Sequence, residues 1–145
     1  MLFIVVASLF ACGKKSPPLT EVIPSPTDSL MNVWNKAWSD HDSAAIRGQF
    51  DNDAIVTDDA VVAKNTEEIS AKWIGPYHTL TNGMVTKKIQ EWSTVDRAGY
   101  TGNYEFSVMK ADSIVAKPKG IITLNWKKSD KGEWKVTTAH IHEIK

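Results

Sequence analysis

The sequence lacks the features on which several common functions depend. It holds a single cysteine, Cys12, so an internal disulfide and a two-cysteine redox centre are excluded. Its 17 basic and 17 acidic residues give no net charge, which argues against a nucleic-acid partner. Neither a Gly-x-Ser-x-Gly motif nor a phosphate-binding glycine loop occurs, and no internal repeat is present. The length suits one domain with a hydrophobic core.

The apolar run at residues 2–11 ends directly at Cys12. It is shorter than the roughly 20 residues that a membrane span needs, but it matches the apolar core of a secretory signal. The string Leu9-Phe10-Ala11-Cys12 resembles the lipobox of bacterial lipoproteins. That resemblance implies a signal peptide at 1–11, a lipid on Cys12, and a lipid-anchored position in the bacterial cell envelope facing the periplasm. The alternative is an ordinary secretory signal or a buried strand.

A proline-rich segment follows the cysteine. Four of the six prolines lie within residues 12–26, with serine and threonine between them. Such a composition favours extended conformations that bury little surface. We therefore predict that residues 12–26 form a tether between the lipidated Cys12 and a domain at 27–145.

Helix signals dominate the first half of this domain, and strand signals dominate the second. The predicted helices begin at Ser25-Pro26, Asp42 and Asn65, and the third is predicted to end at Gly75-Pro76. The predicted strands cover residues 53–58, 61–62, 85–92, 100–109, 114–126 and 134–144. Helices followed by a strand meander are typical of an α+β domain with helices packed on one sheet face.

Four strings, in this order, resemble the SnoaL-like branch of the nuclear transport factor 2-like superfamily. They lie at residues 34–42, 50–54, 96–102 and 126–140. The resemblance implies a cone-shaped, curved antiparallel sheet packed on N-terminal helices, as in a cystatin-like roll, and a homodimer. It does not imply a particular activity, because one fold hosts many functions.

A cone of this kind leaves room for a pocket lined by aromatic rings. The predicted pocket residues are Trp34, Trp38, Trp73, Tyr104, Phe106, Trp126, Trp134 and His140. The alternative is that these rings fill the cone and leave no pocket.

Asp58 is a candidate catalytic base. In the ketosteroid isomerases of the superfamily, the base closes a string similar to residues 53–58 here. The isomerases also need donors for an oxyanion: a tyrosine on the first helix, where this chain has Trp34, and an acid on a late strand, where it has Leu124 or Asn125. The missing donors argue against isomerase chemistry. Asp58 could instead serve only to form a turn.

His140 is the second candidate catalytic residue, because strand alternation places it on one face with Trp134 and Val136. The resemblance to SnoaL-like cyclases implies an acid/base pair in this region, with Asp58 opposite. His140 and His142 have the spacing of two metal ligands, but a site needs a third. Asp58 or Glu105 could supply it, yet nothing in the sequence requires this, so we expect no metal and no cofactor.

Three functions remain compatible with the sequence. The first is an envelope lipoprotein that binds a small apolar or aromatic molecule in the pocket. The second is a proton-transfer enzyme, such as a cyclase, isomerase or dehydratase, that uses Asp58 and His140. The third is a pocketless domain that docks another protein through its sheet. The aromatic residues and the missing oxyanion donors favour the first.

Overall fold

The computed structural model describes residues 24–144. The predicted signal peptide, Cys12 and most of the predicted tether lie outside these residues. Within the described part of the chain, no helix is long and apolar enough to cross a membrane.

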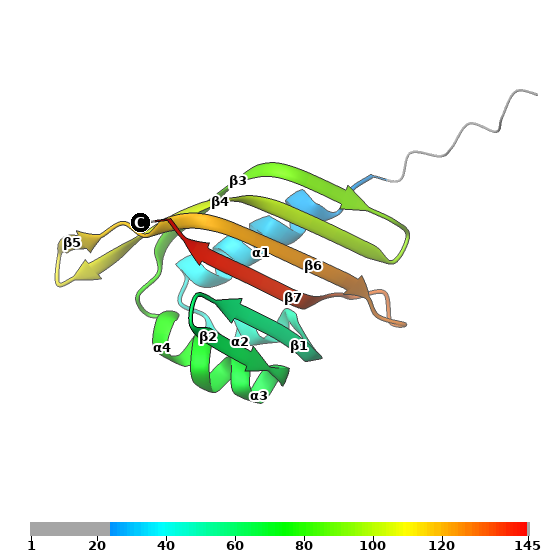
Figure 1. The fold of residues 1–145 in the computed structure, drawn as a ribbon, viewed down its shortest axis with the longest axis horizontal. Helices are drawn as coiled ribbons and strands as arrows, with labels where there is room; N and C mark the ends of the chain where they lie inside the picture. The colour runs from blue at the N-terminus through cyan, green and yellow to red at the C-terminus, as the bar shows by residue number, and fades with distance from the viewer. Residues whose placement is uncertain (1–23, 145) are drawn as a thin grey trace, which may run out of the picture.

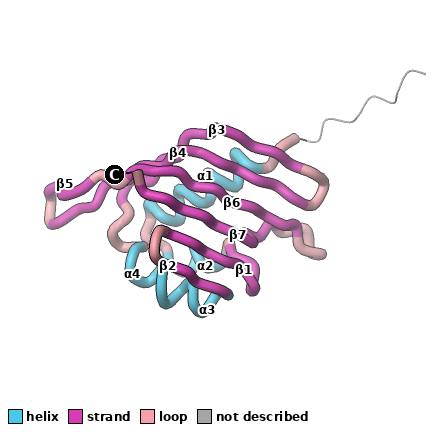
Figure 2. Tube along the Cα trace, viewed as in Figure 1, coloured by secondary structure: helices cyan, strands magenta, loops and turns pink. Residues whose placement is uncertain are grey.

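A curved sheet and the helices on one of its faces make up the described structure (Figures 1 and 2). The strands are β1 (Phe50–Asp58), β2 (Val61–Lys64), β3 (Asn82–Ser93), β4 (Arg97–Lys110), β5 (Ser113–Ala116), β6 (Lys119–Lys128) and β7 (Trp134–Glu143). Their order across the sheet is β2-β1-β7-β6-β4-β3, and β5 pairs with the end of β4 as a projecting hairpin arm. This α+β arrangement confirms the predicted fold class.

The sheet is mixed rather than wholly antiparallel. β1 runs parallel to β7, whereas the other paired strands are antiparallel. A parallel pairing is possible here because β1 and β7 lie far apart in the sequence and no hairpin joins them. The predicted strand at 114–126 is also divided into β5 and β6, with Lys117-Pro118 between them, because proline cannot donate a ladder hydrogen bond.

The helices begin where the sequence indicates. They are α1 (Thr27–Ser39), α2 (Ser43–Gly48), α3 (Asn65–Ile69), the π-helical turn η1 (Ser70–Ile74) and α4 (Gly75–Tyr77). The Asp42 side chain caps α2 by accepting from the Ala45 N–H at 2.9 Å. At the start of α3, the Asn65 side chain accepts from the Glu68 N–H at 3.0 Å.

The third helical segment does not end at Gly75-Pro76, as predicted. It continues through both residues into α4, since proline is tolerated in the first turn of a helix. The preceding π turn widens the helix, and the adjacent side chains of Trp73 and Ile74 are both buried there.

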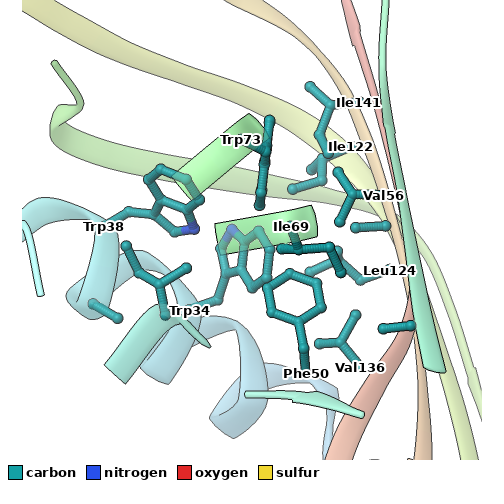
Figure 3. Packing of buried hydrophobic residues seen from close by; sticks show 14 of the residues in the cluster. Trp34, Trp38, Phe50, Val56, Ile69, Trp73, Ile122, Leu124, Val136 and Ile141 are labelled. Atoms are coloured by element: carbon teal, nitrogen blue, oxygen red, sulfur yellow. The ribbon is translucent and has the colours of Figure 1, made fainter. Parts of the chain in front are cut away.

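One hydrophobic core joins the helices to the sheet. Helix α1 packs on β3, and α3 packs on β1. Buried side chains of the two layers meet in a single cluster that includes Trp34, Trp73, Val56, Leu124 and Val136 (Figure 3).

A β-bulge in β7 decides which of its side chains face this core. Trp126 pairs with Val136 and Asn125 pairs with Thr138, so Thr137 is an extra residue in β7. The bulge shifts the alternation by one residue. Val136 is therefore buried before it, and Ala139 and Ile141 are buried after it, while His140 is exposed.

Gly120 provides the closest backbone approach in the sheet. It pairs with Tyr104 across β4 and β6, and a Cβ there would lie 2.0 Å from the His142 carbonyl oxygen and 2.9 Å from Tyr104 Cε1. Since the first of these neighbours is backbone, a side chain cannot be accommodated by a rotamer change.

We expect Gly120→Ala to lower the free energy of unfolding by about 1–3 kcal/mol because it overpacks the sheet. Urea unfolding of the full chain measures this loss. Gly48→Ala is the matched control, since no atom lies within 4 Å of its added Cβ and the change favours a helix. Equal effects of the two substitutions would contradict the close approach.

Candidate functional site

A cavity of about 370 Å³ lies between α1, the η1–α4 segment and the inner face of the sheet. Most of its wall is apolar, with carboxylates at one side. It is partly open, and Tyr77 and Leu80, both exposed, lie at its border. A concave apolar space with a few polar groups is the usual form of a small-molecule site.

Aromatic rings form the inner end of this cavity. Trp34 and Trp38 come from successive turns of α1 and meet Trp73 of η1 (Figure 3). The ring centroids of Trp38 and Trp73 are 4.7 Å apart in an edge-to-face arrangement, and those of Trp34 and Trp73 are 6.1 Å apart. Tyr104 and Phe106 add stacked rings from β4.

The indole nitrogens of Trp34 and Trp38 are buried without a hydrogen-bond partner among the described residues. Figure 3 shows both nitrogens on the ring sides that face the middle of the aromatic cluster. Each nitrogen is closed off from solvent, so a molecule in the cavity would meet mainly the ring carbons of these two residues. Unpaired buried donors are costly, which marks this cluster as unusual for a plain core.

Asp58 lies at the cavity wall, at the end of β1. Its Oδ2 accepts a 2.7 Å hydrogen bond from the indole Nε1 of Trp73. Burial raises the pKa of Asp58 above its usual value, and the charges of Asp59 and Glu143 add to this rise. The Trp73 hydrogen bond and, as the smallest effect, the nearby His140 oppose it. The carboxylate is thus held in place by a neutral donor.

Tyr104 is a further polar residue at the cavity wall. Its side chain is only 6% exposed, and its hydroxyl has no hydrogen-bond partner within residues 24–144. Burial, followed by the charges of Asp58, Glu143 and Asp59, raises the pKa of Tyr104, so the phenol keeps its proton. The cross-strand partner Gly120 leaves room for the ring.

Asp59 and Glu143 complete the acidic side of the cavity. Asp59 has a positive φ of 45° in the turn between β1 and β2, a conformation that aspartate adopts more readily than most residues. Its carboxylate lies 3.1 Å from Nδ1 of the exposed His142. The position of Glu143 at the cavity could not be predicted from the sequence, because it results from the bulge in β7.

The structure divides the predicted pocket residues into two groups. Trp34, Trp38, Trp73, Tyr104 and Phe106 line the cavity together with Asp58. The predictions for the remaining three residues were wrong, and these are Trp126, Trp134 and His140.

Each of these three residues lies away from the cavity for a reason that the strand pairing shows. Trp126 is buried in the core near Val136, away from the cavity, and Trp134 precedes the β7 bulge at the far end of the strand. His140 follows the bulge and points to the outer face, where Nδ1 lies 2.6 Å from Thr57 Oγ1. Asp58 and His140 therefore do not converge on one space, and the predicted catalytic pair is not formed.

Among residues 24–144, no group of three potential metal ligands comes together. His140 and His142 are both exposed, and His142 is engaged by Asp59.

Solved structures with the same arrangement identify the fold. A ketosteroid isomerase-like protein from Erwinia carotovora atroseptica superposes with a TM-score of 0.70, at 13% identity over 81% of this chain and 93% of the other. The chain has a nuclear transport factor 2-like fold. A superfamily protein from Salmonella enterica Typhimurium gives a TM-score of 0.65 at 11% identity, covering 79% of this chain and 86% of the other.

A further protein with a cystatin-like fold, from Nostoc punctiforme, gives a TM-score of 0.64 at 13% identity, covering 81% of this chain and 88% of the other. No protein-family profile matches the sequence, and comparison with curated proteins gives no match. Such low identities establish the nuclear transport factor 2-like fold and not an activity.

The raised pKa of Asp58 predicts a pH-dependent effect of Asp58→Asn. The folded state holds the carboxyl proton more tightly than the unfolded chain, so ionised Asp58 costs stability above the raised pKa, and this cost vanishes below the usual value of 3.8. Asparagine removes the charge and keeps an oxygen for Trp73. We expect the variant to be more stable than wild type at pH 7.5, by less than about 1 kcal/mol because water at the cavity mouth screens the group.

Urea unfolding between pH 4 and 8 measures this difference, which should shrink as the pH falls. Asp53→Asn, at an exposed position of the same strand, controls for the loss of one negative charge. A stability difference that does not change between pH 4 and 8, or that grows in favour of the variant as the pH falls, would contradict a raised pKa of Asp58.

Proposed function

We propose that this chain binds a small apolar or aromatic molecule in the cavity between α1 and the sheet. The observation that carries the proposal is the cavity itself: about 370 Å³ of mainly apolar space that six aromatic side chains border. A domain that served only as a docking surface would have no need of this space, because filling it would add packing contacts.

Proton transfer by Asp58 and His140 is not proposed, because His140 bonds to Thr57 on the opposite face of the sheet. Leu124, one of the two residues that could match the acid position of the isomerases, is buried and apolar. Asp58 then has the role of a polar anchor for the ligand, with Tyr104 as a second polar contact.

The alternation of side chains along β4 shows which residue could be enlarged to fill the cavity. Tyr104, Phe106 and Val108 are two residues apart and all line it, with Val108 toward the hairpin arm. A larger side chain at Val108 would occupy the cavity without replacing a buried core residue. Val62 on β2 is 52% exposed and does not border the cavity, so it offers a matched site.

We expect a panel of uncharged one- to three-ring aromatic compounds to contain members that raise the melting temperature of full-length Cys12→Ser protein. At 100-fold excess over Kd, a ligand adds about 2.7 kcal/mol to the free energy of unfolding. Val108→Trp should abolish the shift, and Val62→Trp should retain it. The proposal is wrong if no compound stabilises the protein, or if Val108→Trp leaves every shift intact.

The lipobox-like string supports a further part of the proposal: Cys12 carries a lipid, and residues 12–26 join the domain to a bacterial membrane. The support is the sequence Leu9-Phe10-Ala11-Cys12 after an apolar run, and the proline-rich segment that follows. The ligand would then be met on the periplasmic side of that membrane.

Because Cys12 is the single thiol of the chain, labelling with radioactive palmitate in a bacterial host tests it directly. Wild-type protein should carry label in the membrane fraction, and Cys12→Ser should carry none. The double variant Cys12→Ser/Ser16→Cys, which moves the thiol behind Lys14-Lys15, should also remain unlabelled. Label in Cys12→Ser, or equal label in the double variant, would refute lipidation at this motif.

A further inference from the structure

The charges at the cavity wall are all of one sign. Three carboxylates border it, those of Asp58, Asp59 and Glu143. Among the described residues that line the cavity, none is a lysine, an arginine or a histidine. An anionic ligand would therefore meet repulsion without compensation, and a cation would meet attraction.

Two of these carboxylates have no cationic partner. Asp58 is bonded by the neutral indole of Trp73, and neither Asp58 nor Glu143 forms an ion pair with another residue in the described range. Asp59 differs, because His142 lies 3.1 Å away at the outer rim. Asp58 and Glu143 are thus the carboxylates that a ligand could neutralise.

The field of these acids reaches the interior of the cavity. Burial at the cavity wall is the main cause of the raised pKa of the Tyr104 phenol, and the carboxylates of Asp58, Glu143 and Asp59 add to it. Its hydroxyl has no partner in the described structure, and its oxygen can accept a hydrogen bond from an ammonium group. The same cavity therefore offers an unpaired acceptor beside the uncompensated charge.

The apolar part of the wall favours the same kind of molecule. Six aromatic side chains border the cavity. The indole nitrogens of Trp34 and Trp38 are closed off, so these two rings present carbon rather than N–H donors. The negative face of an aromatic ring attracts a cation, most strongly for tryptophan. Carboxylates and aromatic rings together form an electronegative site with an apolar interior.

We propose that the ligand is an aromatic or apolar amine, whose ammonium group binds to the carboxylates of Asp58 and Glu143 and whose apolar body lies against Trp34, Trp38 and Trp73. This inference rests on the proposed function and adds the chemical class of the ligand. It excludes carboxylates, sulfonates and phosphates as ligands of this cavity.

Three probes with the same two-ring body isolate the effect of charge: 2-naphthylmethylamine, 2-naphthylmethanol and 2-naphthoate. Isothermal titration calorimetry of full-length Cys12→Ser protein at pH 7.5 and low salt gives their affinities. We expect the amine to bind on the order of ten-fold more tightly than the alcohol, and the naphthoate to bind more weakly than the alcohol.

Two variants locate the charge effect. Asp58→Asn and Glu143→Gln should each lower the ratio of amine to alcohol affinity several-fold, because each variant removes a negative charge and keeps a polar group of the same size. Glu143 is exposed at the mouth, so its replacement does not disturb the core. Asp53→Asn removes a carboxylate from the same strand as Asp58 but away from the cavity, and should leave the ratio as in wild type.

The possible outcomes separate the two proposals. Alcohol or naphthoate binding as tightly as the amine overturns the charge selectivity but leaves apolar binding intact. A ratio that neither Asp58→Asn nor Glu143→Gln changes also overturns it. If none of the three probes binds, the cavity is not a site for small aromatic molecules, and both proposals fail.

Discussion

The packing of Trp34, Trp38 and Phe50 against Trp73 is the contact on which the rest of this molecule depends. These four rings come from α1, from the start of β1 and from the π turn, and their centroids lie 4.7–6.2 Å apart. Large rigid rings cannot collapse to fill every gap as flexible aliphatic side chains do. The cluster therefore fixes the helices on the sheet and leaves the cavity beside it.

Trp73 also couples this packing to the chemistry of the cavity. Its ring belongs to the aromatic cluster, while its N–H holds the carboxylate of Asp58 at the wall. The π turn that carries Trp73 is a rare backbone form, often found at functional sites. A hydrogen bond from a neutral donor positions the carboxylate without cancelling its charge, which leaves that charge available to a ligand.

Much of this arrangement could be predicted from the sequence. Capping residues located the starts of α2 and α3, and β-branched runs located most strands, because those signals are local. The aromatic residues of α1 and β4 were expected at a pocket, since alternation along a regular strand is reliable there. The sequence motif at residues 53–58 indicates Asp58 as a candidate site residue. Its hydrogen bond to Trp73 depends on tertiary packing and could not be predicted.

The errors on β7 share one physical origin, which is that a bulge cannot be read from composition. The extra residue Thr137 reverses the alternation of β7, so His140 moves to the outer face while Ile141 and Glu143 reach the cavity. The bulge therefore takes the candidate base His140 away from the cavity and places Glu143 there, although no sequence motif indicates Glu143. The parallel pairing of β1 with β7 was missed for a related reason, since it joins segments distant in the chain.

The central claim, that the cavity beneath α1 is a ligand site, is tested most directly by the indole N–H signals of the six tryptophans in a ¹⁵N-¹H correlation spectrum. Titration of full-length Cys12→Ser protein with 2-naphthylmethylamine should shift the signals of Trp34, Trp38 and Trp73. The signals of Trp92 and Trp134, which do not line the cavity, should stay in place. Shifts confined to Trp92 or Trp134, or no shift at saturating amine, would contradict the account.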